Sequence, residues 1–209
     1  MEFAKTGGRD LTKPGHHAHR ALMTKFEKTS AMPNVYQAET VFWNHKTGRQ
    51  YTAVINMLLI SEILDCIIRR GRSVSELVDT SGKPLLEATK KEYCHRMNMG
   101  DPTDVAAIGF WGDGAPFGVK NSVNLLLFSV LTGHDKARYW LAGFTKRLMC
   151  KCGCSGRCTL LPIFKVLAWD LKQLLLGFWS DTRHDGTPFA ASEFQNDLAR
   201  AQRGKKTKM

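Results

Sequence analysis

The chain has 209 residues, of which 43% are hydrophobic, and it carries a formal net charge of +11 at pH 7. This length fits one domain, and this composition is enough for a core. The N-terminal "MEFAKTGGRD" lacks the apolar stretch of a secretory signal. Charges interrupt both of the most apolar windows, so neither offers the roughly 20 apolar residues of a bilayer span. We therefore expect a soluble intracellular protein with no membrane partner.

The first half of the chain is predicted to be mostly helical. Residues 1–17 are polar and glycine-rich and predict a disordered N-terminus. His16, His17 and His19 could bind a metal, but we interpret this cluster as incidental. Residues 18–100 are predicted to be mainly helical, and within them "VYQAETVFW" alternates like a short strand or an extended segment. The expected helices span residues 18–29, residues 52–70, a short segment opened by a Ser73–Glu76 capping box, and Pro84 to Met97.

Strand-like runs begin after "GDPTD". "VAAIGFW", "VNLLLFSVLTG" and "YWLAGFTKRLM" have strand length, and their continuous apolarity favours strands covered on both faces. After a cysteine-rich loop, residues 160–179 predict a long buried helix. The expected fold class is α+β or α/β, with a helical N-terminal half followed by a three-stranded sheet and that helix. A basic tail occupies residues 191–209.

A glycine-flanked acid, Asp113, follows the first of these runs in "IGFWGDGAPF". Open α/β sheets bind ligands at the carboxyl ends of their strands, which makes Asp113 a candidate functional acid. The alternative is a turn, because Asp, Gly and Pro are typical turn residues. "DGAPF" recurs as "DGTPF" at residues 185–189, and two copies of one turn, each closed by a buried phenylalanine, would explain both segments.

Four cysteines lie within nine residues in "CKCGCSGRC": Cys150, Cys152, Cys154 and Cys158. Zinc favours four thiolate or imidazole ligands, although their usual spacing is wider. A mononuclear zinc site could use three of these thiols with His184, or with Cys94 and His95. Reduced thiols without a metal, and a redox or disulfide role, remain open alternatives. Flanking cations would lower the thiol pKa values and would also offer a basic patch to a phosphate backbone.

The basic excess favours polyanionic partners through counterion release. A solvated tail is the alternative interpretation, and "RGKKTK" is a weak candidate for nuclear targeting. The candidate nucleic-acid-binding residues are Lys146, Arg147, Lys151 and Arg157 around the cysteines, and Arg200, Arg203, Lys205, Lys206 and Lys208 in the tail. A further polar segment, "SDTRHDG", carries Asp181, Arg183, His184 and Asp185, which could bind a metal or phosphate or simply satisfy a helix end.

"GFWGDGAPF", the paired strands, "CKCGCSGRC", the Leu/Trp-rich helix and "RHDGTPF" together resemble transposase-like proteins of protist mobile elements, over roughly residues 50–190. The resemblance implies a partial ribonuclease-H-like domain at residues 101–190. It also implies an ancestral metal-binding role for Asp113, since an acid on the first strand of that fold helps to hold two divalent metals. Mg²⁺ or Mn²⁺ would serve only a catalytically competent chain, in which Asp181 or Asp185 would assist Asp113.

The later acids that the resemblance requires are missing, because Asp197 lies in a polar, helix-like tail with no strand around it. We therefore expect a transposon-derived, catalytically inactive protein that binds DNA or another nucleic acid. The alternatives are a zinc-stabilised protein-interaction module, a metal-dependent nuclease or transposase fragment, and a chain with no selected function. A missing neighbour strand would leave "AAIGFW" as an open edge, which predicts a homodimer through that edge or a partner strand.

Overall fold

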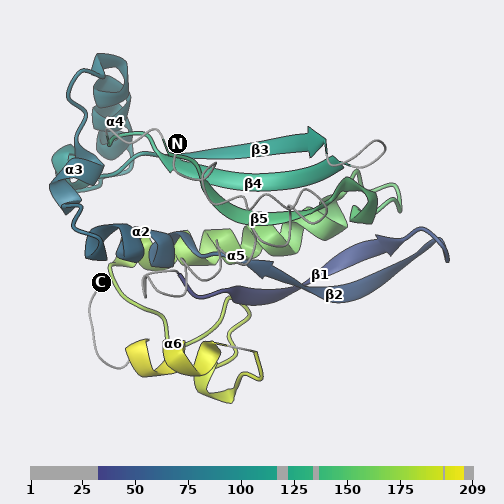
Figure 1. The fold of residues 1–209 in the computed structure, drawn as a ribbon. Coiled ribbons are helices and arrows are strands. Elements are labelled where there is room, and N and C mark those ends of the chain that lie inside the picture. The colour runs from purple at the N-terminus through teal and green to yellow at the C-terminus, as the bar shows by residue number, and fades with distance from the viewer. Residues whose placement is uncertain (1–32, 117–121, 134–136, 195, 205–209) are drawn as a thin grey trace, which may run out of the picture. The chain divides into compact units, whose positions relative to one another are not determined.

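The computed structural model of the chain describes residues 33–116, 122–133, 137–194 and 196–204 (Figure 1). The predictions of a disordered N-terminus, of incidental histidines and of a helix at 18–29 lie outside these residues. The elements are β1 (Tyr36–Asn44), β2 (Arg49–Met57), α2 (Ile60–Arg69), α3 (Val74–Val78), α4 (Pro84–Arg96), η2 (Pro102–Asp104), β3 (Ile108–Pro116), β4 (Ser122–Val130), β5 (Tyr139–Thr145), η3 (Lys146–Leu148), α5 (Arg157–Leu176), η4 (Phe189–Ala191) and α6 (Asp197–Gly204).

The first two strands form an antiparallel hairpin that corrects the expected helix at 52–70. Register runs from Tyr36 opposite Met57 to Asn44 opposite Arg49. The turn is closed by Asn44, whose carbonyl accepts from the Gly48 N–H at 2.8 Å, with Gly48 at a φ of 65°. Within β2, buried Ile55 and Met57 alternate with exposed neighbours, which is the period of a strand and not of a helix. The helix begins only at Ile60.

One five-stranded antiparallel sheet has the order β1-β2-β5-β4-β3. The predicted three-stranded sheet is therefore wrong in its strand number: β3, β4 and β5 are joined by the hairpin, through Met57 opposite Ala142. Among the described strands, β3 lies at an edge and pairs with β4 alone. Its Phe110 and Trp111 are 48% and 42% exposed, so this part of the sheet is not covered on both faces as expected.

The long helix α5 packs along β1 and α2 and supplies much of the core. Its buried residues Ile163, Val166, Leu167 and Asp170 recur at helical spacing on one face. The helix stops at Gly177, which adopts a left-handed φ of 69° as a C-cap. None of the described helices is both long enough and apolar enough to span a bilayer.

A carboxylate on α5 caps a second helix. Leu59, at the N-cap of α2, has no side chain that can accept a hydrogen bond. Asp170 supplies the missing cap, because its carboxylate accepts hydrogen bonds from the Ser61 N–H at 3.1 Å and from the Ser61 hydroxyl at 2.5 Å. Burial nevertheless raises the pKa of Asp170 to about 6, against the lowering effect of these hydrogen bonds.

Candidate metal centre

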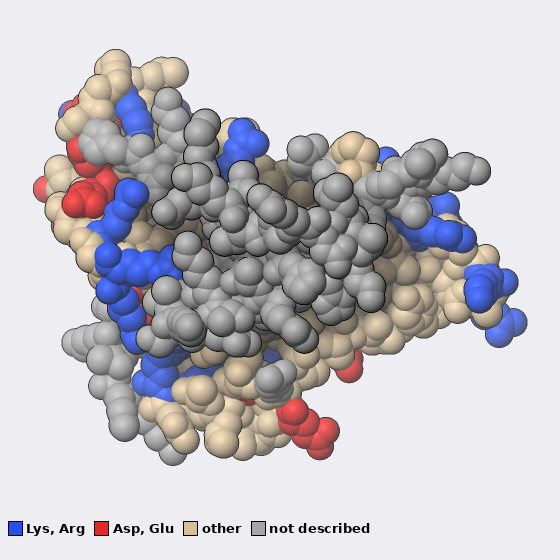
Figure 2. All heavy atoms as spheres, in the orientation of Figure 1, with Lys and Arg blue, Asp and Glu red and all other residues tan. Residues whose placement is uncertain are grey.

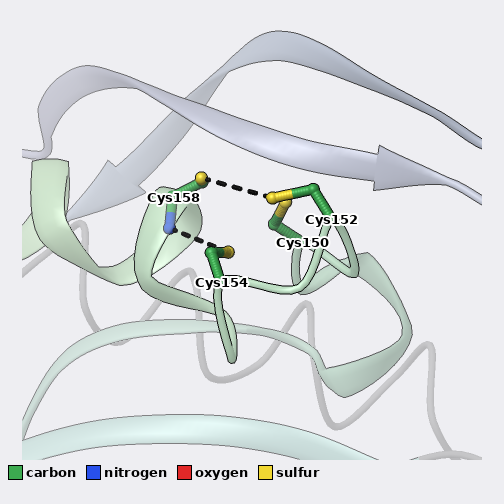
Figure 3. Close-up of side chains that lie close together, drawn as sticks. All are labelled: Cys150, Cys152, Cys154 and Cys158. Atoms are coloured by element: carbon green, nitrogen blue, oxygen red, sulfur yellow. Dashed lines mark hydrogen bonds between the residues drawn. The ribbon is translucent and has the colours of Figure 1, made fainter.

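The four clustered cysteines converge on one point. The Sγ atoms of Cys150, Cys152, Cys154 and Cys158 all lie within 4.8 Å of one another, and Figure 3 shows the four side chains turned toward a shared space. The Cys152 and Cys158 sulfurs are 3.8 Å apart. A tetrahedral zinc with Zn–S bonds of 2.3 Å needs sulfurs about 3.8 Å apart. The cysteines therefore lie close enough to hold a metal ion.

Backbone conformation explains how so short a segment gathers four thiols. Gly153, Ser155 and Gly156 have φ values of 91°, 51° and 82°, so the chain reverses direction repeatedly between the cysteines. Gly156 has a φ of 82°, a conformation that residues with a Cβ rarely adopt, so a substitution there would be strained. We call residues 150–158 the cysteine loop.

Both ends of the cysteine loop are fixed to the hairpin by one threonine. The buried Thr159 hydroxyl donates to the Val41 carbonyl at 2.6 Å and accepts from the Cys150 N–H at 3.0 Å. The Thr159 carbonyl accepts in turn from the Thr40 hydroxyl at 2.7 Å. The first and last residues of the loop are therefore held in place by protein contacts, whereas the residues between them depend on the cysteine cluster.

Hydrogen bonds from a side-chain amide and from a backbone N–H reach two of the sulfurs. The Gln50 side-chain amide donates to the Cys150 Sγ at 3.0 Å, and the Cys158 N–H donates to the Cys154 Sγ at 3.5 Å. This backbone hydrogen bond is the main reason why the pKa of Cys154 falls to about 6. Hydrogen bonding to Cys154 raises the pKa of Cys158 to about 12. One thiol of the cluster therefore ionises readily, whereas a bound cation would be needed to keep several thiolates close to one another.

The alternative zinc ligands from the sequence do not join the cluster. Among the described side chains, the four cysteines form the one group of at least three potential ligands. His184 instead hydrogen-bonds the Tyr36 hydroxyl through Nδ1 at 2.7 Å, and burial lowers the pKa of His184. Cys94 is buried in α4. All six cysteines are free, so the structure contains no disulfide.

The three candidate catalytic acids have different surroundings. Asp113 lies within β3, opposite Leu125, so its segment is a strand and not the turn that the repeated "DGxPF" suggested. Asp185 does form such a turn, since its carboxylate accepts from the Thr187 N–H at 2.9 Å, and Phe189 of the same motif is buried. Asp181 is exposed in the segment before it. Neither Asp181 nor Asp185 belongs to a group of potential metal ligands among the described residues.

The cations flanking the cysteine loop face outward. Lys146, Arg147, Lys151 and Arg157, which we call the loop cations, are all exposed. No acidic residue occurs between residues 137 and 169. In Figure 2, Lys and Arg side chains gather at the right of the view, where Figure 1 places the tip of the β1–β2 hairpin and the turn between β5 and α5.

The hairpin tip adds contacts that the sequence interpretation missed. His45 hydrogen-bonds the Arg147 carbonyl through Nε2, and Lys46 and Arg49 are exposed on the same turn. Their roles, like that of Gln50, were hidden because residues 45–50 lie about a hundred positions before the cysteines. The role of Thr159 was hidden because its partner Val41 lies 118 positions earlier. If "NHKTG" had been recognised as a hairpin turn, the sequence would have indicated a basic hairpin tip. No other local pattern pointed to these residues.

Two of the tail cations are turned inward. Arg200 is 2% exposed, and its guanidinium contacts Glu62 and Asp197, both at 2.9 Å. Arg203 contacts the same Glu62 at 2.7 Å and stacks over Trp179 at 3.7 Å from the ring centre. The expectation that these two arginines face a nucleic acid therefore conflicts with their placement. Lys205, Lys206 and Lys208 lie outside the described residues.

The remaining polar residue of that region, Arg183, belongs to the same interior network. Its guanidinium pairs with Asp197 and donates to the Gln37 carbonyl at 2.5 Å. Arg183 and Asp185 of "SDTRHDG" therefore make contacts within the chain, while the buried Arg183 Nε has no hydrogen-bond partner among the described residues. In comparisons with protein-family models, curated proteins and solved structures, nothing matches this chain.

Proposed function

We propose that this chain is a transposon-derived, catalytically inactive nucleic-acid-binding protein built around a structural zinc site. One observation carries the proposal: a cluster of four mutually close thiols lies on a loop whose other long side chains are exposed cations. The thiols would hold the loop in shape, and the cations would contact phosphates. Neither role requires a reacting group.

Zinc is the metal that best suits this ligand set. Four thiolates in a tetrahedral arrangement select zinc or iron, and a site with four protein ligands has no open position for a substrate or a water molecule. Such closed sites are structural. The donated hydrogen bonds from Gln50 and from the Cys158 N–H suit charged sulfurs, as outer contacts of metal-bound thiolates do.

Nucleic acid is the partner that best suits the charge distribution. The loop cations and the hairpin's Lys46 and Arg49 supply six exposed positive charges around one loop. Local charge of this kind acts on polyanions through counterion release, without any need for base recognition. The short basic run beyond residue 203 would add to this attraction and would be consistent with a nuclear protein.

The ribonuclease-H-like ancestry remains part of the proposal. Its support is the succession of three antiparallel strands and a long helix, with Asp113 on the first strand. The hairpin β1–β2, placed beside β5, is an addition to that pattern. Incubation with supercoiled DNA in Mg²⁺ or Mn²⁺ tests the inactivity. We expect no nicking, whereas nicking that disappears in Asp113→Asn would establish a nuclease instead.

Zinc content tests the structural half of the proposal. Mass spectrometry of the reduced chain under non-denaturing conditions should find one zinc per chain. The double variant Cys152→Ser/Cys154→Ser should lose it, and Cys66→Ser, which alters a cysteine outside the cluster, should retain it. A zinc-free chain, or retention of zinc by the double variant, would refute the site.

Salt-dependent binding tests the nucleic-acid half. Affinity for a short duplex should fall steeply between 50 and 200 mM salt, in proportion to the phosphates contacted. Changing all four loop cations to glutamine should flatten this dependence. The matched control changes Arg69, Lys91, Arg96 and Lys172 to glutamine, which removes the same charge from α2, α4 and α5. Equal effects from both sets would mean that net charge alone drives binding.

A zinc-stabilised interaction module is the second candidate, and the edge strand β3 favours it. Its outward N–H and C=O groups face no described strand, and the exposed Phe110 and Trp111 lie on it. Another chain, including a second copy, could pair there. Sedimentation analysis separates the candidates: dimers that dissociate in Trp111→Lys favour the module, and a monomer at micromolar concentration disfavours it.

A further inference from the structure

A cavity of ≈ 730 Å³ opens between η3 and the cysteine loop. The described residues that line it include three cations, Lys146, Arg147 and Lys151, and two serines, Ser122 and Ser155. None of these described lining residues is acidic. Its size is in the range of small-molecule sites and exceeds what a free phosphate needs.

The cysteine loop has two sides, and the residues alternate between them. Cys150, Cys152 and Cys154 turn toward the metal site. The intervening Lys151, Gly153 and Ser155 line the cavity. Only Cys150 contributes to both. The conformation that gathers the thiols is therefore the same conformation that forms one wall of the cavity.

The opposite wall does not depend on the cysteines. Lys146 and Arg147 belong to η3, directly after β5, and the Arg147 carbonyl is held by His45 of the hairpin. Thr159 fixes the start and the end of the loop to β1. Loss of the metal should thus release residues 151–156 and leave the other wall and α5 in place.

We infer that this cavity binds a phosphate group of a nucleic-acid strand, with its attached sugar, and that it does so only when the four cysteines hold their metal. The inference rests on the zinc site proposed above. By fixing the cysteine loop, zinc also places Lys151 and Ser155 opposite Lys146 and Arg147. Three cations and two hydroxyls then surround one anionic group, which is the donor set that phosphate oxygens favour.

A double-mutant cycle between metal and cation tests the inference. The probe is a fluorescein-labelled 12-nucleotide single strand, titrated at 0.1 M salt into zinc-loaded and chelator-treated protein. Lys151→Gln should weaken binding roughly fivefold in the loaded protein, as expected for one phosphate contact on a single strand at 0.1 M salt. In the metal-free protein it should have less than a twofold effect. Lys172→Gln, a change on the exposed side of α5, should have little effect in both states.

Each outcome bears on the inference in a different way. An equal loss in both metal states would show that the cavity does not depend on the metal. No loss in either state would show that it binds no phosphate. Both results leave the proposed zinc site intact, because the zinc content is measured separately and Lys151 is not a ligand.

A second measurement avoids the metal-free state, in case chelation unfolds the chain. Hydrogen exchange of the zinc-loaded protein is followed with and without inorganic pyrophosphate as the probe. Protection should appear at residues 151–156 and not in α4, and it should be absent from Lys146→Gln/Lys151→Gln. Unchanged exchange in the wild-type loop would overturn the inference. If pyrophosphate protects the loop but the labelled strand does not compete with it, the cavity serves a free phosphate compound and not nucleic acid.

Discussion

The loop cations and the α6 arginines, Arg200 and Arg203, look alike in the sequence but have opposite surroundings. Both sets lie in short basic stretches with few acids nearby. In the fold, the loop cations are exposed, whereas Arg200 is buried and Arg203 stacks on Trp179. The difference arises from Glu62 on α2, which contacts both arginines. A positive charge becomes a structural contact when the fold supplies a buried acid, and it stays available to a partner when the fold does not.

Electrostatics makes this difference strong. Arg200, Glu62 and Asp197 are each at most 2% exposed, so water does not solvate these charges and they stabilise one another instead. Removal of one member leaves the remaining buried charges with fewer oppositely charged partners. The loop cations have no such dependence, because water solvates them before any partner arrives. The two sets should therefore respond to substitution in different measurements.

The largest expected effect concerns Glu62. Glu62→Gln keeps the shape and removes the charge that contacts Arg200 and Arg203. The free energy of unfolding should fall by roughly 3–5 kcal/mol, as for other broken buried ion pairs. Urea denaturation measures it, with Glu39→Gln, an exposed acid on β1, as the control. A loss below about 1 kcal/mol would mean that the network is solvated.

A somewhat smaller loss is expected for the threonine that fixes the cysteine loop. Thr159→Val has nearly the same volume and removes the hydroxyl shared by Val41 and Cys150. One buried and one half-buried backbone group lose their partner, so the unfolding free energy should fall by roughly 2–4 kcal/mol. Thr89→Val, at an exposed hydroxyl on α4, serves as the control. Zinc affinity should also weaken, and unchanged affinity would contradict the anchoring role of Thr159.

The buried acid Asp170 should make stability depend on pH. Its pKa rises to about 6 in the folded chain, above the roughly 3.9 of an unfolded aspartate. The native state then binds more protons between these values, so the contribution of Asp170 to stability falls as pH rises from about 4 to about 7. The free energy of unfolding of wild type, measured relative to that of Asp170→Asn, should fall by up to about 3 kcal/mol as pH rises through this window. A pH-independent difference would contradict the raised pKa.

The smallest expected effect on stability is that of the loop cations. Their replacement by glutamine should change the free energy of unfolding by no more than about 0.5 kcal/mol per site, because they are exposed. The same variant should bind DNA with a flatter salt dependence. A large loss of stability without a change in DNA binding would mean that the loop cations, like the α6 arginines, serve the fold and not a partner.

Local signals in the sequence predicted several elements well. The Ser73 cap forms as expected, since the Ser73 hydroxyl accepts from the Glu76 N–H at 3.2 Å. The helix from Pro84, the strand at β1 and the long helix α5 also occur close to their predicted bounds. Each of these has a cap, an alternation or a stop residue of its own. The gathering of the four cysteines was similarly suggested by their short spacing.

Features that depend on distant residues could not be predicted in this way. The apolar run at 52–60 fits a buried strand and a buried helix equally, and its pairing with β1 decided between them. "DGAPF" and "DGTPF" share four of five letters, yet β4 pairs with residues 113–116 of the first copy and makes them part of a strand. Arg200 is buried by Glu62, which lies 138 residues earlier in the chain. Each outcome was set by a partner that no local pattern indicates.

X-ray absorption at the zinc edge of the purified, reduced chain would test the central claim most directly. The four-cysteine site predicts a first shell of four sulfurs at about 2.3 Å with no nitrogen or oxygen. A shell containing nitrogen or oxygen, or fewer than four sulfurs, would contradict the assignment of Cys150, Cys152, Cys154 and Cys158 as the complete ligand set.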